Sequence, residues 1–322
     1  MRHYLARRLL QVIPTLVGIS FLVFLIINAV PGSSLSYLIG PHMTWEQIEA
    51  REKQLGLDRP LLQRYLTWLS ETARGNLGYS IRYSGRSVAD LIRARLGPTL
   101  LLTFTALSLS FLVAVPIGVY SATHQYSRGD YLVTFLTMAA VSVPVFFLGI
   151  AAVKLFAFDL GWFPVGGMTD IGREHGSRLG YLLDLAHHLV LPVSVLACAE
   201  TARFVRFIRS SMLEVLGQDY IRTARAKGLA QRVVIYRHAL RNALIPVITI
   251  LGLSLPLLFS GALLTEIVFA WPGMGVLSLE AVQTLDYPLL MGINLFLALM
   301  VILGNLLADI FYAAADPRIR YR

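Results

Sequence analysis

Long apolar segments alternate with polar ones along the chain, and five of them contain no Asp, Glu, Lys or Arg over about 20 residues. A helix of about 20 apolar residues crosses the hydrocarbon core of a bilayer, which is about 30 Å thick. We therefore predict five transmembrane helices, at residues 11–30, 99–122, 131–153, 243–265 and 289–308.

A sixth apolar segment is shorter, because its uncharged part covers only residues 187–199. It continues to residue 209, where Arg203, Arg206 and Arg209 can extend their side chains to the membrane surface. We interpret it as a sixth span. The predicted fold class is an all-α polytopic integral membrane protein with six transmembrane helices, which places both termini on the same side.

Basic residues of short loops indicate that side, because they concentrate in the cytoplasm. Lys and Arg gather near the N-terminus, between residues 203 and 241 and in the C-terminal tail, whereas residues 266–288 have none. Both termini are therefore predicted to be cytoplasmic. The basic loop 31–97 is long enough to be translocated despite its charge. Arg7 and Arg8 before the first apolar run also fit a secretory signal, but an uncleaved anchor is favoured because the run is long and further spans follow.

The predicted organisation has four parts. Residues 1–30 form the cytoplasmic N-terminus and first span, residues 31–97 a small extracytoplasmic helical insert, residues 98–312 a five-helix core, and residues 313–322 a cytoplasmic tail. In the insert, Thr44 and Gln47 fit the start of a helix that Gly56 would end. A second amphipathic helix is expected at residues 60–73, where apolar residues recur at helical spacing: Leu61, Leu62, Tyr65, Leu66 and Leu69.

Composition supports residence in a membrane and excludes an ordinary soluble enzyme. Hydrophobic residues make up 56% of the chain and charged residues only 15%, against about 25% charged residues in soluble domains. The net charge is +9, from 28 Lys and Arg against 19 Asp and Glu. A single cysteine, Cys198, excludes an internal disulfide framework and is expected to be a small buried apolar residue.

Several kinds of catalytic or cofactor chemistry find no support in the sequence. None of the lysines, Lys53, Lys154 and Lys227, follows a glycine, so the chain lacks the phosphate-binding loop of nucleotide hydrolases. Gly252 and Ser254 begin a hydrolase-like elbow, but Pro256 replaces its final glycine. The seven histidines are scattered, which disfavours a metal site. The chain is expected to bind no cofactor and to be no enzyme.

Two transport mechanisms within the chain are also disfavoured. Arg203, Arg206 and Arg209 have the spacing of a voltage-sensor helix, but we expect no acidic partners for them in neighbouring spans. An ion-coupled carrier would carry ionisable residues at membrane depth, whereas Lys154, Glu266 and Asp309 fall at the ends of spans.

The most informative segment is the cytoplasmic connection at residues 211–242. Asp219 is suited to cap a short helix at residues 220–227, and Gly228 to end it in the left-handed conformation. A second helix is expected from about Ala230. The pattern predicts a helix, a glycine turn and a helix on a basic surface beneath the membrane. A solvated loop remains an alternative, whereas a DNA-binding helix-turn-helix is disfavoured because both ends are tethered to the bilayer.

This connection resembles the coupling loop of the permease subunits of ATP-binding cassette (ABC) importers, in particular the peptide and nickel group. Two runs carry the resemblance: Asp219-Tyr220-Ile221-Arg222-Thr223-Ala224-Arg225-Ala226-Lys227-Gly228-Leu229 and Arg237-His238-Ala239-Leu240-Arg241-Asn242-Ala243-Leu244-Ile245-Pro246. The family motif begins Glu-Ala-Ala. Here Arg222, Thr223 and Ala224 occupy those places, and Gly228 keeps the register of the motif glycine. The missing acid removes any role assigned to that glutamate.

The resemblance extends over nearly the whole chain. Further matching runs are Arg7-Arg8-Leu9-Leu10, Gly56-Leu57-Asp58-Arg59-Pro60, Gly161-Trp162-Phe163-Pro164, Glu266-Ile267-Val268-Phe269-Ala270-Trp271-Pro272-Gly273-Met274-Gly275, Asp286-Tyr287-Pro288 and Asp316-Pro317-Arg318-Ile319-Arg320. Ser33-Ser34 and Asn76 depart from the pattern, where Asp-Pro and Asp are usual. These departures lie outside the coupling loop.

The resemblance implies a type I importer fold in a bacterial inner membrane, with this chain forming half of the pore for di- or oligopeptides or similar solutes. It implies a homologous second permease as partner in a heterodimer, two ATPase subunits that bind ATP and Mg, and an extracytoplasmic substrate-binding protein. The residues expected to dock the ATPase are Asp219, Tyr220, Arg222, Thr223, Ala224, Arg225, Lys227, Gly228 and Leu229. An external turn or gate is expected at Glu266, Pro272, Gly273 and Gly275, where Pro and Gly favour a tight turn.

Two other classes of function stay open on the sequence. One is a self-contained channel or ion-coupled carrier, and the other is a membrane-tethered regulator. Neither would need an ATPase, and only the regulator would bind nucleic acid. The transported substrate cannot be read from the residues.

Overall fold

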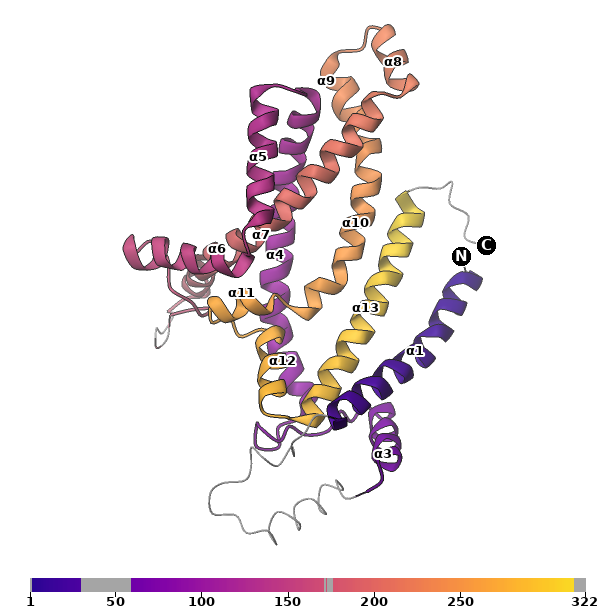
Figure 1. The fold of residues 1–322 in the computed structure, drawn as a ribbon, viewed down its shortest axis with the longest axis vertical. Coiled ribbons are helices and arrows are strands. Elements are labelled where there is room, and N and C mark those ends of the chain that lie inside the picture. Colours follow the sequence, from indigo (N-terminus) through magenta and orange to yellow (C-terminus); the bar gives the residue numbers. More distant parts are fainter. Residues whose placement is uncertain (1, 30–58, 171, 173–175, 316–322) are drawn as a thin grey trace. The chain divides into compact units, whose positions relative to one another are not determined.

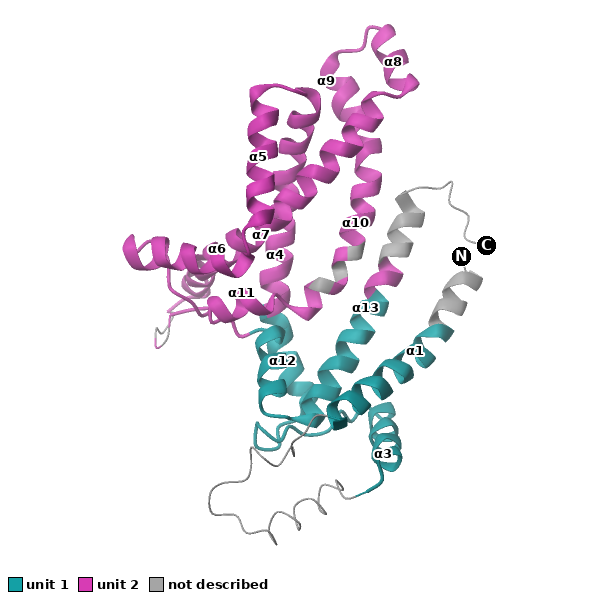
Figure 2. Cartoon of the chain, in the orientation of Figure 1, with its two compact units in different colours: residues 1–98, 273–303, 321–322 teal, residues 99–272, 304–320 magenta. Residues whose placement is uncertain are grey.

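The computed structural model describes residues 2–29, 59–170, 172 and 176–315 (Figure 1). The predicted helix between Thr44 and Gly56 lies outside these residues. The described chain folds into helices and two compact units (Figure 2). Unit 1 comprises residues 1–98 and 273–303, together with 321–322, and unit 2 comprises residues 99–272 and 304–320. Two long helices, α4 (Val88–Thr123) and α13 (Tyr287–Ala315), contribute residues to both units.

Unit 1 contains α1 (Arg2–Ala29), α3 (Leu61–Ala73) and α12 (Met274–Gln283), with the first part of α4 and most of α13. Its largest core includes Val88, Leu91, Leu277 and Ile293. Close packing in this core requires a glycine at residue 292, because a Cβ there would lie 2.4 Å from Val88 Cγ1. The start of α4 and α13 thus approach more closely than larger residues allow.

The predicted helix 60–73 is confirmed as α3, but its apolar residues are divided between two environments. Tyr65 is buried against Phe24 and Met291, and its hydroxyl group hydrogen-bonds with Ser20 Oγ at 2.9 Å. Leu61, Leu62 and Leu66 are instead exposed. Only the part of the predicted apolar face around Tyr65 therefore packs α3 against α1.

Unit 2 is built around α7 (Arg178–Leu216), which packs against α5 (Arg128–Ser142), α6 (Val145–Ala152) and α10 (Arg241–Ser260). Its remaining elements are the π-helix η1 (Val153–Asp159), α8 (Asp219–Ala226), α9 (Gln231–Val233), the π-helix η2 (Val234–Leu240) and α11 (Leu263–Val268). Within unit 2, α8 and α9 lie beyond the ends of α7 and α10, away from α6 and α11 (Figure 1).

Five described helical segments are long and apolar enough to cross a membrane: Leu10–Ala29, Val88–Thr123, Arg178–Leu216, Gln231–Gly252 and Tyr287–Leu307. The weak sixth span of the sequence analysis is thus part of a 39-residue helix, α7. The expected fold, a polytopic helical membrane protein, is confirmed. The number of spans rises to six if α5 and the bent segment after it, α6 with η1, are counted as one span.

The predicted uninterrupted span at residues 131–153 is wrong. The chain breaks after Ser142, and Arg128–Ser142 and Val145–Asp159 form an angle of 96°. The residue before a proline is restricted to extended backbone, and Val143 before Pro144 has φ −89° and ψ 125°. The span predicted at residues 243–265 also ends early, at Ser260, because Gly261 leaves the helical conformation with φ +81° before α11 begins.

Candidate functional site

The short helix α8 is held to unit 2 by one narrow face. Ile221 is completely buried and Ala224 nearly so, in a core shared with Met212 of α7 and with Val234 and Ala239 of η2. The other α8 side chains face outward. This is the periodicity of an amphipathic helix, in which residues three apart share a face. The helix is therefore docked through two aliphatic side chains.

The start of α8 differs from the sequence expectation. We expected Asp219 to cap the helix, but Asp219 is its first residue, Gln218 holds the cap position, and no side chain caps the helix. The Asp219 carboxylate instead lies 3.4 Å from Arg222 Nη1, with its side chain 95% exposed. An acid in the first turn still interacts favourably with the helix dipole.

The end of α8 is as expected. Gly228 has φ +71°, and its N–H donates to the carbonyl of Arg225 at 3.0 Å. The N–H of Leu229 reaches back to the carbonyl of Ala224 at 3.4 Å. These two bonds are the Schellman pattern that closes a helix on a left-handed glycine. A Cβ on Gly228 would meet no atom within 4 Å, so backbone conformation rather than space favours glycine here.

The second helix expected from Ala230 is also present, as α9 followed by η2, which continues into α10. We call residues 219–240 the α8 element. Most of its large exposed side chains are aromatic or apolar (Tyr220, Leu229, Val233, Tyr236) or basic (Arg222, Arg225, Lys227, Arg232, Arg237), and Thr223 and Gln231 are also exposed. Asp219 is the only acidic residue in this range. A surface of this composition suits a protein partner with an acidic rim and an apolar groove.

A buried ion pair that no sequence pattern indicates joins α7 to the start of α5. Arg209 of α7 binds the Asp130 carboxylate with two nitrogens, Nε to Oδ1 and Nη2 to Oδ2, each at 2.9 Å. Ser121 of α4 also donates to that carboxylate, and the N–H of Tyr126 donates to it at 3.0 Å. The expectation that Arg203, Arg206 and Arg209 lack acidic partners in other spans is therefore wrong for Arg209. We call these four residues the Asp130 clamp.

Arg203 lies six residues before Arg209 on α7 and has a different environment. Its Nη2 pairs with Glu200 Oε2 at 2.5 Å on the same helix and donates to Ser254 Oγ of α10 at 3.1 Å. Glu200, Arg203 and Ser254 line a cavity of about 180 Å³. The arginine thus links α7 and α10 across that cavity.

The residues expected to form an external turn are divided between the two units. Glu266 and Pro272 belong to unit 2, and Gly273 and Gly275 to unit 1. Glu266 is completely buried rather than placed on a surface. It accepts a hydrogen bond from Thr99 Oγ1 at 2.9 Å, and its carbonyl accepts one from the N–H of Trp271 at 2.8 Å. Gly273 is the residue before α12, and Gly275 is buried within it.

Asp286, the first residue of the Asp-Tyr-Pro run, lies directly before α13 and accepts several hydrogen bonds. Its carboxylate is completely buried and accepts hydrogen bonds from Ser80 Oγ at 2.5 Å, from Arg82 N–H at 3.0 Å and from Leu289 N–H at 3.2 Å. The last bond caps α13. Tyr83 donates to Glu280 nearby, and burial, followed by this bond, raises the pKa of Tyr83.

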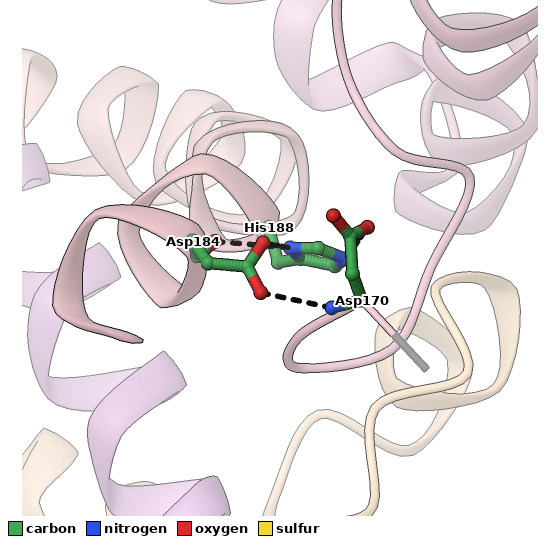
Figure 3. Close-up of side chains that lie close together, drawn as sticks. All are labelled: Asp170, Asp184 and His188. Carbon is green, nitrogen blue, oxygen red and sulfur yellow. Dashed lines mark hydrogen bonds and ion pairs between the residues drawn. The ribbon is translucent and has the colours of Figure 1, made fainter. Parts of the chain in front are cut away.

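Three potential metal ligands meet beside α7, although the sequence analysis treated the histidines as scattered. Figure 3 shows the His188 ring between the carboxylates of Asp184, on the same helix, and Asp170, in the preceding connection. His188 Nδ1 lies 3.1 Å from Asp184 Oδ1, and the Asp170 N–H donates to Asp184 Oδ2 at 2.9 Å. The ligand atoms lie within 4.8 Å of one another. Asp184 and His188 are already hydrogen-bonded in this arrangement, which ties the connection to α7.

The environment of Cys198 also differs from expectation. A lone cysteine in an apolar segment is expected to be buried, but Cys198 is exposed on α7. Position 198 belongs to the outward face of the helix, whereas Ala197 beside it is buried in a core with Leu102 and Trp271.

Two family models match nearly the whole chain. The model of the binding-protein-dependent transport system inner membrane component matches residues 114–321, and the model of the N-terminal part of such membrane components matches residues 1–103. The chain belongs to this family of ABC transporter permeases. The family match includes the whole α8 element. In this family the permease subunit is not catalytic, ATP is hydrolysed in partner subunits, and a substrate-binding protein takes part.

Relatives of this permease match it over its full length. It is 42% identical to the oligopeptide transport system permease protein AppB of Bacillus subtilis, with 100% of both chains covered. It is 38% identical to the di/tripeptide transport system permease protein DppB of Pseudomonas aeruginosa and to the glutathione transport system permease protein GsiC of Escherichia coli K12, again with 100% of each chain covered.

The fold of the permease is similar to that in a solved structure of the MetNI methionine ABC transporter in an inward-facing conformation. The TM-score is 0.55, with 16% sequence identity, and the match covers 70% of this chain and 96% of that one. Together with the family models, this likeness identifies the permease as a multi-pass inner-membrane protein with an ABC importer fold.

Proposed function

We propose that this permease forms half of the pathway of a peptide importer, beside a homologous second permease subunit in a heterodimer. The names of its full-length relatives support peptides as the substrate class, because AppB, DppB and GsiC are named for oligopeptide, di/tripeptide and glutathione transport. Helices pack too closely within one bundle to leave a route for a peptide. The route therefore lies between two permease subunits.

In this proposal the α8 element is the docking site of an ATPase subunit on the cytoplasmic side, where both termini also lie. ATP and Mg are bound by two ATPase subunits, and this chain binds no cofactor. The substrate-binding protein docks on the opposite side of the membrane. We place the turn of Glu266, Pro272, Gly273 and Gly275 on that side. The positive charge of the α8 element supports its cytoplasmic placement, because short basic loops stay inside.

The observation that carries the proposal is the construction of the α8 element. An outward face of Arg222, Arg225 and Lys227 is free to meet a partner, while Ile221 and Ala224 contact the cores of α7 and η2. A displacement of α8 is therefore passed to α7, which is itself a candidate span, and to η2, which leads into α10. Closure of the ATPase subunits would move α7 and α10 in this way, and the pathway would open to alternate sides.

The experiment changes the glycine turn that ends α8. Gly228→Pro removes the N–H that donates to Arg225 and forbids φ +71°, because proline holds φ near −65°. We expect the assembled complex, in liposomes with its ATPase subunits and binding protein, to hydrolyse ATP while peptide uptake per ATP falls about tenfold or more, equivalent to about 1.4 kcal/mol of lost coupling. Uptake and phosphate release are measured together.

Gly75→Pro is a matched control. Gly75 follows α3 with φ +87°, its N–H donates to Thr72 at 2.9 Å, and a Cβ there would also meet nothing within 4 Å. We expect this variant to keep uptake coupled to hydrolysis. Wild-type uptake by an assembled Gly228→Pro complex would contradict the proposal. Peptide transport by the permease alone, without ATP or partners, would instead support a self-contained carrier.

A further inference from the structure

Two adjoining cavities lie along α5 and α7 of unit 2, and we call them together the cleft. The first has a volume of about 350 Å³ and a mainly apolar lining that includes Val113 of α4, Leu136 and Ala140 of α5, and Cys198 of α7. The second, also about 350 Å³, is lined by Arg206, Arg209 and Ser210 of α7 and by Thr134 and Met138 of α5. Val133, Thr137 and Val205 line both cavities, so the two adjoin one another along the contact between α5 and α7.

The cleft changes character along α7. Its apolar part begins at Ser194, and its basic part begins at Arg206, towards the end of α7 that leads to α8. At 1.5 Å per residue these two positions lie about 18 Å apart along the helix. Half of a hydrocarbon core of about 30 Å is about 15 Å. The apolar part therefore has about the length of one bilayer leaflet.

The two arginines at the basic end differ in their partners among the described residues. Arg209 is paired with Asp130 in the Asp130 clamp. Arg206 is exposed, and among the described residues its guanidinium group makes no ion pair or hydrogen bond. An exposed cation at the end of an apolar cleft, beside the Ser210 hydroxyl group, is complementary to a molecule with one anionic end and a long apolar body.

We propose that this cleft binds one anionic phospholipid. Arg206 contacts the headgroup phosphate, Ser210 supplies a hydroxyl group beside it, and an acyl chain lies along Val133, Thr137 and Val205 towards Cys198. Basic pockets between transmembrane helices on the cytoplasmic side commonly recognise anionic headgroups. The site is separate from the α8 element and does not depend on which substrate is transported. It makes the packing of α5 against α7 depend on the lipid composition of the membrane.

The test uses the assembled transporter in detergent and native mass spectrometry. Phosphatidylglycerol and phosphatidylcholine with identical acyl chains are titrated separately, and sn-glycerol 3-phosphate serves as a headgroup without chains. We expect phosphatidylglycerol to bind in preference to phosphatidylcholine. Arg206→Gln should weaken its binding about fivefold, the effect of one basic residue at a membrane surface. Arg128→Gln is the control, since Arg128 is exposed at the start of α5 but does not line the cleft.

Two further measurements separate the lipid from other occupants. Ala140→Leu narrows the apolar part and should reduce phosphatidylglycerol binding while Arg206 is retained. Cys198 is the only cysteine of this chain, so maleimide modification measured on this subunit by mass reports on the apolar part and should slow when phosphatidylglycerol is added. The melting temperature of each variant complex verifies that it remains folded.

Four results would overturn the proposal. These are equal binding of the two lipids, unchanged phosphatidylglycerol binding in Arg206→Gln, binding of glycerol phosphate as strong as that of the lipid, and a Cys198 that resists modification in the complex without lipid. The third result would identify a site for free phosphate compounds. The fourth would indicate that a partner subunit covers the cleft.

Discussion

The helices α3 and α8 end in the same way but are held by different contacts. Gly75 and Gly228 both close a helix with positive φ and the same pair of backbone hydrogen bonds. The face that docks α3 is centred on Tyr65, whose ring packs on α1 and whose hydroxyl group bonds to Ser20 and to the carbonyl of Val17. The face that docks α8 consists of Ile221 and Ala224 alone.

The outward faces differ as well. Leu61, Leu62 and Leu66 are exposed on α3, whereas Arg222 and Arg225 are exposed on α8, as is Lys227 directly after it. Identical cap chemistry therefore accompanies two surfaces of different composition. The cap sets where a helix ends, and the side chains on its two faces determine what it can contact.

The largest effect is expected when the buried side chain that docks α8 is shortened. Ile221→Ala removes most of the aliphatic anchor of α8 and should cost about 2–5 kcal/mol, as for other large-to-small core substitutions. Tryptic cleavage at Arg222, Arg225 and Lys227 should become faster as α8 detaches. Leu62→Ala is the control on α3, because the Leu62 side chain is exposed and its loss should leave the melting temperature of the complex nearly unchanged. A protease-resistant α8 in Ile221→Ala would show that other contacts hold it.

A smaller effect is expected at the polar anchor of α3. Tyr65→Phe keeps the ring but removes the hydroxyl group that bonds to Ser20 Oγ at 2.9 Å and to the Val17 carbonyl at 3.0 Å. We expect a loss of about 1–2 kcal/mol, measured by thermal unfolding of the complex. Combining it with Ser20→Ala should cost less than the sum of the two single changes. Strict additivity would show that the bond contributes nothing.

Alanine at the two caps should have nearly equal effects. At both Gly75 and Gly228 a Cβ would find open space, so Gly→Ala introduces only the strain of a left-handed residue, about 1 kcal/mol at each site. Asparagine, which tolerates this conformation better, should recover part of the loss at each site. Thermal unfolding of the four variants provides the measurement. A much larger loss at one site would show that the two caps are not equivalent.

The smallest effect is expected for Asp219→Ala. The Asp219 side chain is 95% exposed and makes only a long contact with Arg222, so the melting temperature should stay within the error of the measurement. A clear decrease would instead restore the capping role that the sequence suggested.

What the sequence could and could not predict follows from the range of each interaction. The left-handed Gly228 and the helices on either side of it depend on neighbouring residues, and both were predicted correctly. The pairing of Asp130 with Arg209 joins residues 79 positions apart, and no local pattern indicates it. Asp184 and His188 are one helical turn apart, but Asp170 joins them only through the fold of the connection.

The break between α5 and α6 is a different case, because its signal was present in the sequence. Pro144 restricts Val143 to extended backbone, and uniform hydrophobicity across residues 131–153 concealed this restriction. The exposure of Cys198 could not be deduced from hydrophobicity, since a residue that faces lipid or a cleft is as apolar as one in the core. Helix existence was therefore easier to predict than helix direction or the environment of single side chains.

The Asp130 clamp has a mechanical consequence for the proposed transport cycle. One carboxylate ties Ser121 near the end of α4, the start of α5 and Arg209 near the end of α7. A load applied at α8 and carried along α7 is consequently shared by three helices at their common end. The three helices would move as one rigid body. A small displacement at the ATPase would then reach the membrane-spanning segments instead of bending a single helix.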